Sequence, residues 1–342
     1  GSNGLPSACA VTRARIGAVS TASGAAVVSL PLHRRFRGLT ARETMLIPGT
    51  VGWGEFAAFG EYADAVAAPW LRAAREAADL GWPAPVRDTV AVNATVPAVA
   101  ADDVAAVLAS FPGCTTAKVK VAEAGGDGAG GDEAGDLARL EAVRDWLGAR
   151  GRIRIDVNGR WDVAQARRRI PRYERAAGGL EYVEQPCPGV DDLAVLRRHV
   201  DVPIAADESV RLAVDPAAAK EAADVLVLKV APLGGVRACL ALAERVDRPV
   251  VVSSALESSV GLAAGVALAA ALPEVPYACG LGTAALLAED VTDAPLTPSD
   301  GVVQVRRVDP DEARLAALAV EPHRARWWRD RMSRVDARGD AA

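Results

Sequence analysis

Two short runs decide the fold of this chain: RIRIDVN at residues 152–158 and GLEYVEQ at residues 179–185. Both are rich in β-branched or aromatic residues, which favours buried strands, and the Ala/Arg-rich stretch between them is typical of a helix. Strand, helix and strand in this order predict a parallel βαβ unit. Acidic residues lie near the end of each run, Asp156 in the first and Glu184 in the second.

The same unit recurs along most of the sequence. Eight runs are predicted to be strands, and helical stretches rich in Ala, Leu and Arg separate them. The eight runs are residues 90–96, 116–121, 152–158, 179–185, 203–208, 225–230, 249–254 and 276–281. Eight parallel strands with intervening helices indicate a closed (β/α) barrel, and no GxGxxG motif follows the first strand to support an open dinucleotide-binding sheet.

The N-terminal part has a different pattern, with short runs bounded by Gly, Pro or Ser that predict a small antiparallel sheet. These runs are ACAVTRARIGAV (8–19), AAVVSLPL (25–32), ETMLIPG (43–49) and VGWGEF (51–56). The basic segment His33 to Thr40 interrupts them and is either a mobile loop over a site or a solvated turn. Tyr62 to Leu80 is predicted to be a helix that ends at the Gly/Pro-rich residues 81–85.

These patterns predict an α/β protein made of a (β/α) barrel and an α+β capping domain. We place the N-terminal part of the capping domain at residues 5–88 and the barrel at 89–297, and we expect residues 298–342 to return to the capping domain. The Gly-rich residues 123–135 lack the GxxxxGK[ST] order of a phosphate-binding loop. They are therefore interpreted as a surface loop.

Composition excludes several classes of function. The 342 residues are 51% apolar and 24% charged, with a net charge of -5, so neither disorder nor a basic nucleic-acid surface is expected. The apolar run at 260–272 is too short to cross a membrane and is interpreted as a buried helix. Five cysteines without a CxxC pair suit free thiols in the cytoplasm. The expected partner is a small carboxylate, and the expected state is a monomer or small homo-oligomer.

Three carboxylates mark a candidate metal site. Asp156, Glu184 and Asp207 stand at the ends of three successive predicted strands, and active sites of barrels lie at these ends. Any one of them alone could be a helix cap or a surface charge. Together they would converge, and like charges that close raise one another's pKa unless a cation is present. Oxygen ligands without His or Cys favour a hard cation such as Mg²⁺.

Lysines flank this predicted metal site. The chain has four lysines among its 39 basic residues. Lys118 and Lys120 are two positions apart on one predicted strand, so their side chains point to the same face, and Lys229 ends another strand. A neighbouring ammonium and partial burial both favour the neutral amine, so we predict that Lys118 prepares Lys120 to act as a base. The alternative is a lysine whose stem is buried and whose charge lies in solvent.

At this point the chain resembles a known family, the muconate-lactonising branch of the enolase superfamily. The matching motifs are Gly52-Trp53-Gly54-Glu55, Lys118-Val119-Lys120, Asp156-Val157-Asn158-Gly159, Glu184-Gln185-Pro186, Asp207-Glu208-Ser209 and Lys229. The resemblance implies that Asp156, Glu184 and Asp207 hold Mg²⁺ and that Lys120 and Lys229 stand on opposite faces of the substrate. Superfamily members that use a lysine base and a magnesium-stabilised enediolate are a known pattern.

Within that branch, residues 253–259 and 32–53 look most like the o-succinylbenzoate synthases. This resemblance implies a magnesium-dependent dehydratase of menaquinone biosynthesis that converts a succinyl-hydroxycyclohexadiene carboxylate to o-succinylbenzoate. Lys120 would remove the α-proton and then assist loss of the hydroxyl, and Lys229 would act as a cation. We predict that the residues contacting the substrate include Asn158, Ser253, Ser254, Gly280 and Arg37.

Two other functions remain open from the sequence. An N-acylamino acid racemase or dipeptide epimerase would use the same two lysines to exchange protons on opposite faces of its substrate. The sequence shows no obvious cation after the seventh strand to hold an N-acyl carboxylate, which favours the synthase. A barrel that binds a ligand without catalysis is a third reading, and the presence of all three carboxylates and both lysine positions counts against it.

Overall fold

The computed structural model describes residues 24–123 and 132–339. Its N-terminal part is a three-stranded antiparallel sheet in the order β1–β2–β3, formed by Ala26–Phe36, Leu39–Pro48 and Trp53–Phe56. The small antiparallel sheet predicted from the sequence is therefore confirmed for these strands. The run at 8–19 lies outside the described residues, and so do residues 124–131 of the Gly-rich insertion. The last residues of that insertion, 133–135, form the first turn of α3 (Glu133–Leu147).

The basic segment His33 to Thr40 is not a loop in the structure. Its first four residues continue β1 and its last two begin β2, so the connection shrinks to Arg37 and Gly38. Both have positive φ angles, 52° and 77°. A two-residue hairpin turn of type I′ needs positive φ at both central positions, which glycine adopts freely and arginine does not. The segment is thus a tight turn that holds Arg37 in a strained conformation.

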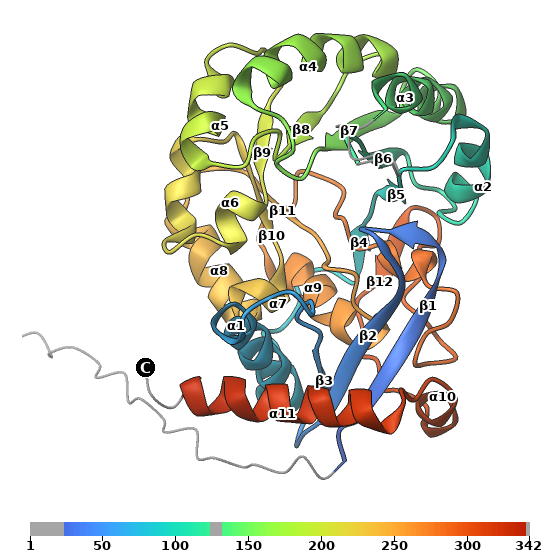
Figure 1. Cartoon of the computed structure of the whole chain (residues 1–342), viewed down its shortest axis with the longest axis vertical. Coiled ribbons are helices and arrows are strands. Elements are labelled where there is room, and N and C mark those ends of the chain that lie inside the picture. Colours follow the sequence, from blue (N-terminus) through green and yellow to red (C-terminus); the bar gives the residue numbers. More distant parts are fainter. Residues whose placement is uncertain (1–23, 124–131, 340–342) are drawn as a thin grey trace, which may run out of the picture.

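The capping domain is completed from both ends of the chain. Helix α1 (Asp64–Arg75) continues into a π-helical turn, η1 (Glu76–Leu80), so the predicted helix at 62–80 starts two residues late. Helix α11 (Pro322–Gly339) lies beside α1 and the sheet, as Figure 1 shows in red near the bottom of the view. Trp328 and Val335 from α11 share one buried apolar cluster with Phe56 and Trp70.

Seven parallel strands form the curled sheet of the barrel, in the spatial order β11–β10–β9–β8–β7–β6–β5. Their bounds are β5 Ala94–Val96, β6 Thr116–Lys120, β7 Arg152–Asp156, β8 Tyr182–Glu184, β9 Ile204–Ala206, β10 Val225–Leu228 and β11 Val250–Val252. The surrounding helices are α2 Val104–Leu108, α3, α4 Val163–Ala177, α5 Val190–Arg197, α6 Glu208–Arg211, α7 Val230–Leu233, α8 Val236–Arg245 and α9 Ser259–Ala271. Figure 1 shows α3, α4, α5 and α8 on the outside of the ring of strands. The predicted α/β barrel with a capping domain is confirmed.

Two predicted strands differ from the structure where the barrel closes. The run at 90–96 is divided at Asn93 into β4 (Thr89–Ala91), which pairs antiparallel with β12 (Val302–Gln304), and β5. The run at 276–281 is not a regular strand. It forms one parallel bridge on each side, Cys279 with Val92 and Gly280 with Ser253. Cys279 N donates to Ala91 O in β4, and Gly280 N donates to Val252 O in β11. These backbone hydrogen bonds close the ring of strands.

The remaining elements connect the barrel back to the capping domain. They are η4 (Thr283–Leu286), β12 and α10 (Glu312–Ala317), whereas the short helices η2 (Ala101–Asp103) and η3 (Pro216–Glu221) lie within the barrel, before α2 and β10. After β12 the chain reaches β1, where Ser29 N donates to Leu318 O and Val320 N donates to Val27 O. Nearly every residue of α9 is buried, as predicted for the apolar run. Within the described part of the chain no helix is long and apolar enough to cross a membrane.

Candidate active site

The sheet order brings the predicted carboxylates to one end of the barrel. Asp156 and Glu184 are the last residues of the neighbouring strands β7 and β8 and are paired in register, and Asp207 follows β9 directly. All three side chains are almost completely buried, with exposures of 1% or less. Lys120 is in register with Asp156 from β6, and Lys229 follows β10. The lysines therefore flank the row of carboxylates on both sides.

Each lysine ammonium contacts a carboxylate. Lys118 Nζ lies 2.8 and 2.9 Å from the two oxygens of Glu184 and 3.2 Å from Asp156 Oδ2. Lys120 Nζ lies 2.6 Å from that same Asp156 oxygen. On the other side, Lys229 Nζ donates to Asp207 Oδ2 over 2.7 Å. Lys118 and Lys120 thus point to the same face, as their spacing predicts.

The charges of this cluster depend on one another. Burial raises the pKa of Glu184 to about 7, helped by the negative charge of Asp156. Burial also opposes ionisation of Asp156, but Lys120 and Lys118 outweigh it and hold the pKa of that carboxyl far below its usual value. The pKa of Asp207 falls to about 2, because Lys229 and Arg211 outweigh the effect of burial. The lysines therefore favour the ionised forms of Asp156 and Asp207, whereas burial and the charge of Asp156 oppose ionisation of Glu184.

The donor set fits a hard divalent cation. Three buried carboxylates on adjacent strand ends supply oxygen ligands, which Mg²⁺ prefers. In residues 24–123 and 132–339, no group of three acidic, His or Cys side chains is arranged ready to hold a metal. The Lys118 ammonium bridges Asp156 and Glu184, so a positive charge contacts two of the three carboxylates.

A cavity lies over this cluster, between the barrel and the capping domain. Three of the residues that line it, Phe36, Arg37 and Phe59, come from the capping domain. The barrel contributes Thr95, Lys118, Lys120, Asn158, Lys229, Ser253, Ser254, Ala255, Leu256, Gly280 and Thr283. All five residues that the sequence nominated for substrate contact therefore lie at this cavity. At Gly280 a Cβ atom would come within 2.4 Å of Ser253 Oγ, so any larger residue there would require the Ser253 side chain to move.

Two side chains that the sequence analysis did not nominate hold Asp207 in place. The buried Gln185 has a positive φ of 41° and accepts hydrogen bonds from Asp207 N and Ser209 N through its amide oxygen. Its amide nitrogen donates to Ser209 Oγ over 2.7 Å. Arg211 Nε donates to Asp207 Oδ1 over 3.1 Å. The i,i+4 spacing of Asp207 and Arg211 was the available signal, because such residues meet on one face of a helical turn.

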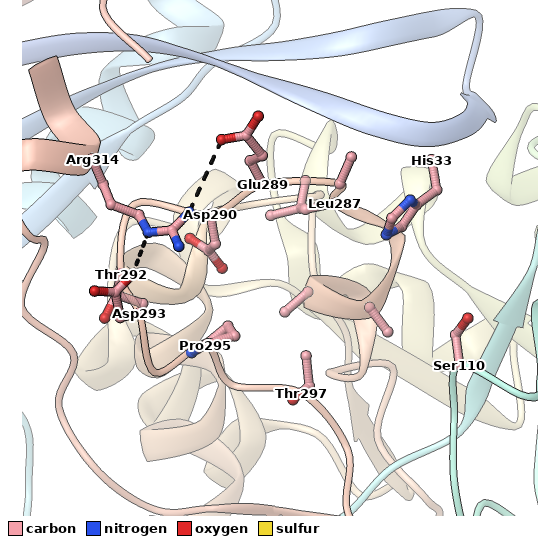
Figure 2. A pocket seen from close by; sticks show the side chains of 13 residues that line it. His33, Ser110, Leu287, Glu289, Asp290, Thr292, Asp293, Pro295, Thr297 and Arg314 are labelled. Carbon is pink, nitrogen blue, oxygen red and sulfur yellow. Dashed lines mark hydrogen bonds and ion pairs between the residues drawn. The ribbon is translucent and has the colours of Figure 1, made fainter. Parts of the chain in front are cut away.

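A second pocket lies away from the lysines, between β1, the end of α2 and the segment around η4 (Figure 2). His33 and Ser110 stand at one end of it and Arg314 at the other. The charged groups of this pocket are already paired: Arg314 Nε donates to Asp293 over 2.5 Å, and Asp290 accepts from Ser259 N. We therefore place the chemistry at the lysine and carboxylate cluster.

Comparison with known proteins agrees with this fold. Residues 100–312 match the family model described as enolase C-terminal domain-like, and residues 27–78 match the enolase N-terminal domain-like model. Among solved structures, muconate lactonizing enzyme from Pseudomonas fluorescens has a TM-score of 0.71 at 24% identity, covering 86% of this chain and 98% of that one. The 2-chloromuconate cycloisomerase from Rhodococcus opacus has a TM-score of 0.70 at 23% identity, with coverage of 87% and 98%. These structures share the fold.

Curated relatives are much more similar in sequence. The o-succinylbenzoate synthase of Thermobifida fusca is 63% identical over 296 residues, which is 86% of this chain and 91% of the relative. The enzyme of the same name from Mycobacterium tuberculosis is 54% identical over 308 residues, or 90% and 91% of the two chains. The chain therefore belongs to the enolase superfamily, within the family of the o-succinylbenzoate synthases.

Proposed function

We propose that this chain is an o-succinylbenzoate synthase, a hydro-lyase of menaquinone biosynthesis. Its substrate is a cyclohexadiene carboxylate that carries a hydroxyl and a succinyl group, and the reaction removes the α-proton and the hydroxyl to give an aromatic ring. The observation that carries the proposal is the flanking of three buried carboxylates by Lys120 on one side and Lys229 on the other, in a chain 63% identical to an enzyme of that name.

The two lysines have different tasks in this proposal. Lys120 removes the α-proton and, once protonated, donates to the departing hydroxyl. Lys229, paired with Asp207 at 2.7 Å, acts as a cation on the opposite side of the substrate. Asp156, Glu184 and Asp207 would hold a Mg²⁺ ion. When bound, this ion supplies positive charge that stabilises the carboxylate oxygens of the enolate.

Residues of the cavity would orient the substrate. Arg37 offers a cation at the capping-domain side, suited to the succinyl carboxylate. Ser253 and Ser254 follow β11 and offer hydroxyl groups, and Asn158 holds the Lys120 ammonium through its side-chain oxygen at 2.8 Å. Gly280 leaves the space that Ser253 fills. A small soluble carboxylate of this kind fits an enzyme acting in the cytoplasm.

A magnesium-dependent assay tests the proposal. The purified chain is mixed with the cyclohexadiene substrate, and formation of the aromatic product is followed by absorbance, with Mg²⁺ and with excess chelator. We expect product only with Mg²⁺. An N-acylamino acid in deuterated water provides the competing assay. Absence of aromatic product together with exchange or racemisation of the acylamino acid would assign the site to a racemase instead.

A further inference from the structure

A chain of hydrogen bonds joins the capping domain to the catalytic end of the barrel. The Tyr62 hydroxyl, in the segment between β3 and α1, accepts two of them. One comes from Arg37 Nη2 over 3.0 Å, and the other comes from Arg211 Nη1 over 2.9 Å. Arg37 belongs to the β1–β2 turn, whereas Arg211 ends α6 in the barrel. A single phenol oxygen therefore connects the two domains next to the cavity.

Arg211 extends this line of hydrogen bonds to the carboxylate cluster. Its side chain is 3% exposed and uses all three of its nitrogen atoms. Nε donates to Asp207 Oδ1 over 3.1 Å, and Nη2 donates to Glu208 Oε1 over 2.7 Å. The other Asp207 oxygen, Oδ2, accepts from Lys229. Arg211 therefore occupies one oxygen of Asp207 and leaves the second directed to the lysine.

A second branch reaches the other lysine. Glu208 Oε1, the oxygen that accepts from Arg211, also accepts from Asn158 Nδ2 over 3.2 Å. Asn158 Oδ1 in turn accepts from Lys120 over 2.8 Å. Arg211 thus lies between two lines of hydrogen bonds, one ending at Lys229 and the other at Lys120. Its position bears on the geometry of both proposed catalytic lysines at once.

Only arginine suits this place. A guanidinium group presents donors in a rigid planar fork, whereas a lysine ammonium is a single point on a flexible stem. The buried guanidinium group also resists displacement, because its charge is balanced by the carboxylates of Asp207 and Glu208 and moving it away would leave buried charges without compensation. The fork of Arg211 therefore keeps Tyr62, Asp207 and Glu208 in fixed mutual positions.

The line of hydrogen bonds begins at Arg37, at the edge of the cavity. Arg37 lines the cavity, and its guanidinium group lies 4.0 Å from the centre of the Phe59 ring. Phe59 and Tyr62 pack edge to face with a centroid distance of 5.6 Å. A ligand carboxylate that reaches Arg37 therefore meets a residue hydrogen-bonded to Tyr62, and through Tyr62 to Arg211.

We propose that Arg211 is a positioning residue of the reaction: through Tyr62 it couples the Arg37 turn of the capping domain to the orientation of Asp207 and Lys229. This inference rests on the proposed function, because its kinetic test measures the proposed reaction. It predicts that substrate contact in the capping domain affects the rate of the chemical step, and not only the strength of binding.

The variant Tyr62→Phe tests the link itself. It removes the shared hydroxyl and keeps the ring that packs on Phe59 and Trp70. We expect kcat to fall about 10-fold, with an unchanged thermal midpoint, because partners behind the ligands of such sites typically change activity or metal affinity about 10–100-fold. Tyr277→Phe, at the opposite end of the barrel strands, is the matched control and should keep the wild-type kcat. A wild-type kcat and KM in Tyr62→Phe would overturn the inference.

A double-mutant cycle tests the coupling. The effects of Arg37→Ala and Arg211→Lys on kcat/KM are measured singly and together, first with Tyr62 present and then in the Tyr62→Phe background. Residues joined through a shared partner give non-additive effects, and independent residues give additive ones. We expect a departure from additivity of about threefold or more with Tyr62 and additivity without it. Additive effects in both backgrounds would contradict the coupling.

A binding measurement separates this inference from the proposed function. Calorimetric titration with Mg²⁺ alone needs no substrate, and we expect Arg211→Lys to weaken binding about 10-fold. Arg245→Lys, which changes an exposed partner of Asp215, is the control and should bind as the wild type does. If the wild type binds Mg²⁺ but forms no aromatic product, the proposed function fails. If Arg211→Lys binds Mg²⁺ like the wild type, the role of Arg211 fails.

Discussion

Lys118 and Lys120 contact the same oxygen of Asp156 but have different surroundings. Lys118 also contacts both oxygens of Glu184, and these carboxylates outweigh burial and hold its pKa well above the usual value. The second partner of Lys120 is the neutral amide of Asn158. Lys118 is therefore held in its protonated form, and Lys120 is the lysine of the pair with fewer carboxylate contacts, which suits the role of base proposed for it.

At the residue scale, the first prediction concerns Lys120. Replacing it with alanine should lower kcat about 10²–10⁴-fold, the usual contribution of a general base. The fold should remain, because the alanine leaves Asp156 with Lys118 as a partner. Turnover and circular dichroism are compared with Lys220→Ala, a lysine of η3 outside the cluster. Near-normal turnover of Lys120→Ala would remove it from the mechanism.

The sequence identifies the charged residues of the site but not their supports. Lysine is rare among the basic residues of this chain, so the lysines at strand ends are conspicuous, and the carboxylates recur once per βα unit. Gln185 and Tyr62 carry no such signal. Gln185 acquires its role from a positive φ that turns its side chain toward Ser209, and Tyr62 from the packing of another domain. Their roles depend on tertiary structure.

At the element scale, carboxylates of the capping domain cap two barrel helices. Glu76 in η1 accepts from Val236 N and Arg237 N, the first amides of α8. Glu55 in β3 accepts from Ser258 N and Gly261 N at the start of α9. The N-terminus of a helix has free amides and a partial positive charge, so a carboxylate there is stabilising.

Glu76→Ala should therefore lower the free energy of unfolding by about 1–2 kcal/mol, the usual loss for a helix cap. The variant leaves the amides of Val236 and Arg237 without their acceptor. Urea unfolding of the wild type and of Glu141→Ala, an exposed change on α3, provides the comparison. A loss no larger than that of Glu141→Ala would show that this contact contributes little.

A further element-scale prediction concerns pH and α11. Burial opposes ionisation of Glu43, but hydrogen bonds from Arg324 and Trp328 outweigh it and lower its pKa below 4.5. A lowered carboxyl pKa adds stability above the unfolded value and loses it as the pH falls. Glu43→Gln should thus be less stable at pH 7, by about 1 kcal/mol or less since solvent screens the pair.

The difference between wild type and Glu43→Gln should shrink as the pH falls below 4.5. Thermal midpoints measured at several pH values from neutral to acidic give this dependence. The exposed pair of Arg245 and Asp215 supplies a control, Asp215→Asn. A constant difference at all pH values would mean that the carboxylate charge of Glu43 has no part in holding α11.

Element boundaries were predictable only where local sequence controls them. Strands β6 to β11 follow from their apolar runs, whereas the segment at 276–281 forms only two bridges because its pairing depends on the neighbouring strands. The turn at Arg37 was one of two interpretations that the sequence left open, and its tight form was not predicted because arginine is uncommon at positive φ. The assigned domain boundaries, 5–88, 89–297 and 298–342, stay a prediction.

For the whole molecule, Mg²⁺ should act as a stabilising ligand. A ligand that binds only the folded state adds about 2.7 kcal/mol at 100 times its dissociation constant, which raises the thermal midpoint by a few degrees. Chelator should reverse the rise. Asp207→Asn removes one of the proposed ligands and should lose most of it. An equal rise in Asp207→Asn would indicate that Mg²⁺ binds elsewhere.

The return of α11 to the N-terminal sheet affects how the chain is made. Arg331 donates to the carbonyl of Ala58, a residue 273 positions earlier, and Trp328 fills the cluster around Phe56. A ribosome adds about 5–20 residues per second. For about 14–55 seconds of synthesis the first three strands therefore lack the helix that covers them. During this time their apolar face is open to chaperones, and the finished protein hides it only after translation has passed Val335.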